Sequence, residues 1–234
     1  MKYLGSKFRY TKEILPIILS DRENNQFYVE PFVGGFNVID KVCGNRIAND
    51  INYYLIELFR AIRSGWVPPD SISEEEYNDI KLYKEDKYPT YLIGFVGFGC
   101  SYGGKYFGGY ARGNDNKGNA RNYCLENKKN ILRQAPFLKN IIITNVNYWE
   151  MKIPPNSIVY CDPPYDGTTQ YKDKMDHKEF WNWVRTLHSE GHNVYVSEYN
   201  APSDFRCVWS KNVITAMAKV DGTKDRVEKL FTLV

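Results

Sequence analysis

The sequence predicts an α/β protein built on a doubly wound, mostly parallel sheet. Seven short runs rich in apolar and β-branched residues are spread along the chain, and segments with helical periodicity lie between some of them. Strands that alternate with helices favour a parallel sheet with helices on both faces. A chain of 234 residues accommodates one such domain with an insertion in one connection.

The seven predicted strands fall before and after one long interruption. They are QFYVEPF (26–32), NRIAND (45–50), NIIITNV (140–146), SIVYCD (157–162), NVYVSEY (193–199), FRCVWS (205–210) and VEKLFTLV (227–234). A helix is predicted over 176–191, where Asp176 and Glu179 form a capping-box pattern and Gly191 ends the apolar stripe.

Residues 53–139 do not follow the alternation, and we expect them to form an insertion in the sheet domain. The segment opens with a helical pattern, YYLIELFRAIRSG, and Ser73 with Glu76 marks a second helix start. Residues 94–113 then hold eight glycines and six aromatic residues in twenty positions. One interpretation is a flexible loop. We favour a partner-contact surface, because exposing Tyr102, Tyr106, Phe107 and Tyr110 without a partner would be costly.

Composition excludes several classes of protein. No apolar run approaches the roughly 20 residues of a membrane span, and the basic N-terminal stretch lacks the features of a signal peptide. The five cysteines are odd in number and form no CxxC pair, which argues against a zinc ribbon or a disulfide framework. We therefore expect a cytoplasmic protein that needs no metal.

The stretch SIVYCDPPYDGTTQY (157–171) suggests a built site. Its apolar run ends at Asp162, which would lie at the C-terminal edge of the sheet, where open α/β sheets bind ligands. Pro163 and Pro164 fix the backbone and remove two N–H donors, so the corner is stiff. A strand end closed by an ordinary Asp-Pro turn is the alternative interpretation.

A second pattern precedes the insertion. In YVEPFVGGFNVI (28–39), Gly34 and Gly35 follow a strand, so backbone can approach a ligand closely. This is not GxGxxG, which disfavours a dinucleotide dehydrogenase. Asp50 ends the next strand, where an acidic residue usually contacts ribose hydroxyls.

These pieces together resemble the alpha group of adenine-specific DNA methyltransferases, the Dam-type family. The matching pieces are YLGSK (3–7), EPFVGG (30–35), NDIN (49–52), TNVNY (144–148), VYCDPPY (159–165), VYVSEYN (194–200) and RVEKLF (226–231). They occur in family order and span nearly the whole chain. The resemblance implies a Rossmann-like methyltransferase sheet with an inserted, largely helical target-recognition domain.

The resemblance also implies an activity, which is methyl transfer from S-adenosylmethionine to the exocyclic amine of a flipped-out adenine in DNA. Asp162 and the carbonyl of Pro163 would accept the two amino hydrogens, Pro164 would keep the corner rigid, and Tyr165 would stack on the base. Residues 1–52 and 140–234 would form the cofactor-binding catalytic domain, and 53–139 the DNA-recognition domain.

The resemblance assigns a cofactor pocket as well. Its expected residues are Tyr3, Gly5, Lys7, Glu30, Phe32, Gly34, Gly35, Asp50, Asn147 and Asp162. Two positions depart from the family pattern. Phe36 stands where a glycine is common, and Asn147 where an acidic residue is common, so we expect weaker cofactor binding.

We expect double-stranded DNA as the partner, contacted by a monomer or weak dimer. Lys105 and Arg112 bracket aromatic residues in a stretch without acidic residues, and the predicted DNA-binding set is completed by Tyr106, Lys128 and Arg133. Two alternatives stay open, a methyltransferase acting on RNA and a catalytically inactive DNA-binding module.

Overall fold

The computed structural model describes residues 1–165, 175–213 and 226–233. The strands are β1 (Tyr28–Glu30), β2 (Arg46–Asn49), β3 (Ile141–Thr144), β4 (Ile158–Cys161), β5 (Asn193–Glu198), β6 (Phe205–Val213) and β7 (Arg226–Leu233). The α-helices are α1 (Thr11–Ile18), α2 (Tyr53–Arg63), α3 (Glu74–Tyr83), α4 (Thr90–Gly94), α5 (Tyr123–Gln134) and α6 (His177–Ser189). Short 3₁₀ turns and one π-helical turn, Phe95–Gly99, complete the described elements.

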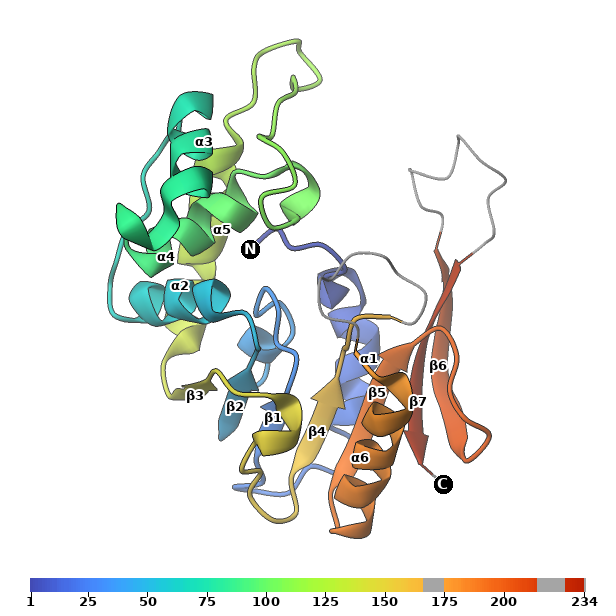
Figure 1. Cartoon of the computed structure of the whole chain (residues 1–234). Helices are drawn as coiled ribbons and strands as arrows, with labels where there is room; N and C mark the ends of the chain where they lie inside the picture. Colours follow the sequence, from blue (N-terminus) through green and yellow to red (C-terminus); the bar gives the residue numbers. More distant parts are fainter. Residues whose placement is uncertain (166–174, 214–225, 234) are drawn as a thin grey trace.

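The seven strands form one sheet in the order β3-β2-β1-β4-β5-β7-β6, and all seven predicted strands are confirmed (Figure 1). The pairs from β3 to β5 are parallel, whereas β7 pairs antiparallel with both β5 and β6. The chain runs outward from β1 to β3 and then returns to place β4 on the other side of β1. The carboxyl ends of β1 and β4 therefore flank the switch point at which α/β sheets bind ligands.

Side chains alternate between two hydrophobic clusters, one on each face of the sheet. Val29 and Val159 point into the cluster that contains Phe180 and Val184 of α6, whereas Tyr28 and Tyr160 point into the cluster on the face of α1. Figure 1 shows α6 in front of the sheet and α1 behind it. The predicted helix over 176–191 is α6, and the side chain of Asp176 accepts the N–H groups that begin it.

The segment 53–139, which we call the insertion, lies between β2 and β3 and contains α2 to α5 (Figure 1). Ser73 and Glu76 form the predicted capping box at the start of α3. Residues of the insertion and of the sheet belong to one hydrophobic cluster. Arg60 and Arg63 of α2 donate to the carbonyl oxygens of Ile143 and Ile141 at 2.9 and 2.7 Å, which satisfies exposed backbone acceptors of the edge strand β3.

Within the described ranges, no helix reaches the length and apolarity that crossing a membrane requires. The same ranges contain no cluster of three or more histidine, cysteine, aspartate or glutamate side chains suited to hold a metal ion.

Candidate active site

Asp162 is the first residue after β4, at the switch point of the sheet. The Nζ atom of Lys7 lies 3.0 Å from its Oδ1 atom and 3.5 Å from Oε2 of Glu228 on β7. The Lys7 side chain is only 7% exposed, and those of Asp162 and Glu228 are 21% and 14% exposed. Segments from three distant parts of the sequence therefore form one buried cluster of two carboxylates and one ammonium.

The three groups of this cluster control one another's charge. Burial lowers the pKa of Lys7, but the nearby carboxylates of Asp162 and Glu228 outweigh it, so the pKa of Lys7 is raised. Burial raises the pKa of Asp162, and Lys7 opposes that rise whereas Glu228 adds to it. Lys7 thus favours an ionised Asp162, and the Tyr165 side chain acts in the same direction.

Tyr165, the last residue of the Asp-Pro-Pro-Tyr corner, is held by the same cluster. Its hydroxyl donates to Oε2 of Glu228 at 2.8 Å, and the ammonium of Lys7 lies 4.5 Å from the centre of its ring. Tyr199 packs edge to face against it, with ring centres 4.6 Å apart. Glu228 was missed as a functional residue by sequence reasoning, although it lies in the RVEKLF piece, because no local signal shows that β7 brings it to the corner.

Asp50 forms a second carboxylate site at the end of β2. Its oxygens accept the backbone N–H of Gly34 at 3.0 Å and of Asn52 at 2.9 Å. Burial raises the pKa of Asp50 to about 6, and the two N–H groups oppose that rise. The structure therefore brings Asp50 and the glycine loop after β1 together.

The two glycines of that loop make room for Tyr3. A Cβ atom on Gly34 would lie 2.7 Å from Cε1 of Tyr3, and one on Gly35 would lie 2.7 Å from its Cβ. Gly34 also has a positive φ of 50°, which favours glycine. The close approach that the sequence suggested for a ligand is thus made here by a side chain of the N-terminal segment.

Phe36, the departure from the family pattern, adopts the backbone conformation typical of a glycine. Its φ is +56°, and its ring is fully buried and stacks on Phe59 at 3.9 Å between centres. We attribute the tolerance of this strained conformation to that packing.

The other predicted pocket residues lie around this edge in different settings. Glu30 ends β1 and is 3% exposed, and burial raises its pKa well above the usual range while the Tyr28 hydroxyl donates to it at 2.9 Å. Phe32 is half-buried against Tyr148. The backbone N–H of Asn147 donates to Glu150 at 3.2 Å, and the carbonyl of Gly5 accepts from Lys7 at 3.3 Å. Their contacts with a cofactor stay predictions.

Comparison with known proteins finds a family that part of the chain resembles. Residues 3–96 match the D12 class N6 adenine-specific DNA methyltransferase family. The match contains both the N-terminal segment that carries Lys7 and the loop that binds Asp50.

Two curated relatives that the chain resembles are type II methyltransferases. M.FokI of Planomicrobium okeanokoites is 25% identical over 210 residues, which cover 80% of this chain and 32% of that protein. M.CviBI of Paramecium bursaria Chlorella virus NC1A is 25% identical over 209 residues, which cover 80% of this chain and 78% of that protein. The chain thus spans about a third of the length of the first relative.

Among solved structures, yhhF of Escherichia coli, a protein assigned as a methyltransferase, aligns with a TM-score of 0.41 and 10% identity. The alignment covers 99% of this chain and 88% of that one.

The glycine-aromatic run of the insertion is packed, and the prediction of an exposed aromatic surface is wrong for three of its four rings. Phe107 is 9% exposed, Tyr106 and Tyr110 are half-buried, and only Tyr102, at 58%, is exposed. A Cβ atom on Gly97 would lie 2.6 Å from the ring of Tyr106. The glycines therefore let aromatic rings pack against the backbone and form part of the core of the insertion. This packing also excludes the interpretation of the run as a flexible loop.

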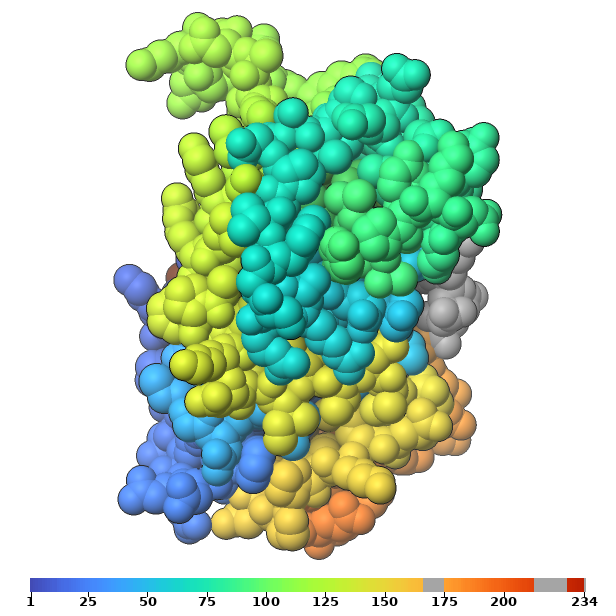
Figure 2. All heavy atoms as spheres, turned by 90° about the vertical axis from the view of Figure 1, so that its left-hand side faces the viewer, coloured from blue at the N-terminus to red at the C-terminus, as the bar shows by residue number. Residues whose placement is uncertain are grey.

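Four basic residues of the predicted DNA-binding set lie on or near the surface of the insertion. Lys105 and Arg133 are exposed, Arg112 is paired with Glu74, and Lys128 lies 2.7 Å from Asp70. Figure 2 shows the light-green segment around 112–120 projecting beyond the helices. Contacts of these residues with DNA stay predictions.

Proposed function

We propose that this protein transfers a methyl group from S-adenosylmethionine to the exocyclic amine of adenine in double-stranded DNA. The observation that carries the proposal is the Asp-Pro-Pro-Tyr corner at the switch point, with its aspartate paired to a buried lysine 3.0 Å away. The family match and the relatives named methyltransferases support the same reaction class.

The corner suits the chemistry of an aromatic amine. The lone pair of the adenine amine is delocalised into the ring, so the nitrogen becomes nucleophilic only when it is pyramidalised. Asp162 would accept one amino hydrogen and the carbonyl of Pro163 the other, which aims two acceptors at the place where positive charge develops. Lys7 favours the ionised acceptor, and the prolines fix its position.

The residues around Asp50 fit the methyl donor. A partly exposed carboxylate held by two backbone N–H groups is oriented for ribose hydroxyls, and the adjacent Ile51 is 64% exposed, which offers apolar surface to a purine. Bound S-adenosylmethionine would supply a methyl carbon activated by its positively charged sulfur. The chain itself would orient this donor through Asp50 and the acceptor amine through Asp162.

DNA would be held by the insertion. In this proposal residues 1–52 and 140–234 act as the catalytic domain and 53–139 as the DNA-recognition domain. An adenine stacked inside a duplex is out of reach of Asp162, so the base would be flipped toward Tyr165. The exposed Lys105 is suited to neutralise a backbone phosphate.

The test is transfer of a labelled methyl group to duplex DNA, with single-stranded RNA of the same sequence as a parallel substrate. We expect labelled N6-methyladenine in DNA, and a loss of about 10²- to 10³-fold or more in Asp162→Ala. S-adenosylmethionine binding should stay within a few-fold, and Asp21→Ala, which alters an exposed aspartate, should behave as wild type.

Three outcomes would contradict the proposal. Near-normal turnover by Asp162→Ala would reject the mechanism, and methylation of RNA in preference to DNA would reject the substrate. Cofactor binding without transfer to either nucleic acid would favour an inactive DNA-binding module.

A further inference from the structure

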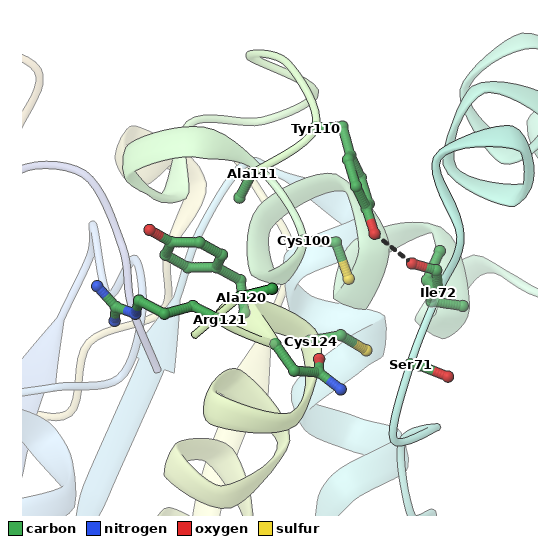
Figure 3. A pocket seen from close by; sticks show the side chains of 10 residues that line it. Ser71, Ile72, Cys100, Tyr110, Ala111, Ala120, Arg121 and Cys124 are labelled. Atoms are coloured by element: carbon green, nitrogen blue, oxygen red, sulfur yellow. Dashed lines mark hydrogen bonds between the residues drawn. The ribbon is translucent and has the colours of Figure 1, made fainter. Parts of the chain in front are cut away.

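A cavity of about 250 Å³ lies inside the insertion, apart from the Asp162 corner (Figure 3). Its lining includes the two cysteines Cys100 and Cys124 together with Ser71, Ile72, Tyr110 and Arg121. Tyr110 closes one side, since its hydroxyl donates to the carbonyl of Ile72 at 2.7 Å. A small molecule in this cavity would lie beside two thiols that are almost completely buried. Cys100 is 1% exposed and Cys124 is 5% exposed.

The two thiols are adjacent although 23 residues separate them in the sequence. Cys100 follows the π-helical turn Phe95–Gly99, and Cys124 is the second residue of α5. Both side chains line the same cavity, and Sγ of Cys124 lies 3.4 Å from the carbonyl oxygen of Pro69. Both sulfurs are drawn in Figure 3.

The surroundings make the two cysteines unequal. Cys124 lies in the first turn of a twelve-residue helix, where unpaired backbone N–H groups favour a thiolate. The interaction with the neighbouring Cys100 thiol lowers the pKa of Cys124 and outweighs burial. Lys128 acts in the same direction, while Asp70 and Glu76 oppose it. The same pairing, with burial, raises the pKa of Cys100.

We propose that Cys124 and Cys100 form a peroxide-reactive pair, in which Cys124 is the nucleophile and Cys100 the resolving thiol. The Cys124 thiolate attacks one oxygen of a hydroperoxide, the O–O bond breaks, and a sulfenic acid and hydroxide form. The Cys100 sulfur then attacks the Cys124 sulfur, which forms the S–S bond and releases water. In sum two thiols are oxidised to a disulfide and hydrogen peroxide is reduced to two waters.

The bond would join the two ends of the segment 101–123. That segment contains Lys105 and Arg112, so the proposed oxidation acts on the same part of the insertion as the proposed DNA contact. The oxidation itself does not depend on methyl transfer, and its test needs no DNA.

The test uses the full chain with Cys43→Ser and Cys207→Ser, because these two cysteines are exposed and would consume oxidant. The protein is treated with a small excess of hydrogen peroxide and its cysteines are mapped by peptide mass without reduction. We expect a Cys100–Cys124 cross-link that weighs two hydrogens less than the two thiol peptides and is reversed by dithiothreitol. Cys161 is fully buried and serves as the internal control that stays reduced.

Single substitutions in this background assign the roles. Cys100→Ser should trap a sulfenic acid on Cys124 that reacts with dimedone, whereas Cys124→Ser should leave Cys100 unlabelled and slow peroxide consumption by about tenfold or more. Circular dichroism checks that each variant is folded. The proposal is overturned if Cys100 and Cys124 stay reduced at peroxide concentrations that oxidise Cys43 and Cys207 in the unmodified chain, or if dimedone labels Cys100 instead. The peptide mapping needs no substitution at Cys100 or Cys124, so it shows whether these two cysteines are oxidised even if a serine variant does not fold.

Discussion

Replacing Lys7 by methionine tests the buried charge cluster most directly. The substitution removes the ammonium that lies 3.0 Å from Asp162 and 3.5 Å from Glu228, and it keeps an unbranched side chain of similar length. Two buried carboxylates then face each other without a cation. We expect Asp162 to be protonated at higher pH than in the wild type, because burial and Glu228 both raise its pKa once Lys7 no longer opposes them.

The size of the effect follows from the geometry. A charge pair at 3.0 Å attracts with roughly 5 kcal/mol at an effective dielectric constant near 20. Removing one partner of a buried pair typically costs about 3–5 kcal/mol. Loss of the ammonium therefore shifts Asp162 toward its neutral form, because burial and Glu228 both raise its pKa. Protonation removes an acceptor for the amine, so activity should fall most at low pH and recover as pH rises.

The assay is kcat/KM for methyl transfer between about pH 6 and pH 10, with S-adenosylmethionine affinity measured at each pH. Lys7→Arg keeps the charge and should leave the acid limb near that of the wild type. Lys12→Met, which removes an exposed lysine of α1, should change neither rate nor pH profile. If the Lys7→Met profile is lower than that of the wild type by the same factor at every pH, Lys7 does not control the ionisation of Asp162.

Three further predictions follow from the same structure. Asp50→Ala should weaken S-adenosylmethionine binding in calorimetry and change kcat at saturating cofactor much less, because Asp50 lies at the expected ribose contact; normal affinity would assign it another role. Gly34→Ala should lower the free energy of unfolding in urea by about 1–3 kcal/mol, because its φ is +50° and the new Cβ would clash with a ring, and an unchanged midpoint would contradict that packing. Lys105→Ala and Arg112→Ala should each reduce the salt dependence of DNA binding by about one unit of slope, with Lys12→Ala on α1 as the control outside the insertion. Unchanged DNA affinity in the double variant would show that the insertion does not bind DNA through this surface.

The sequence by itself determined the elements whose signals are local. Apolar runs located all seven strands, and a capping pattern located the starts of α3 and α6. Both carboxylates at the sheet edge, Asp50 and Asp162, were found because each ends such a run. The residues that follow parallel strands lie at the same edge of the sheet, however the rest of the protein packs. The position of these two carboxylates therefore follows from the strand pattern alone.

Tertiary structure decided what lies against those residues. Glu228 reaches Lys7 and Tyr165 only because β7 runs antiparallel beside β5, and the glycines after β1 contact Tyr3 from a segment about thirty residues away. The aromatic run of the insertion gave the wrong prediction for the same reason. Its composition is compatible with an exposed surface or with a packed core, and burial depends on which side chains from distant helices fill the space around it. Local sequence fixes where a side chain leaves the backbone, whereas its exposure and charge depend on neighbours that only the fold brings together.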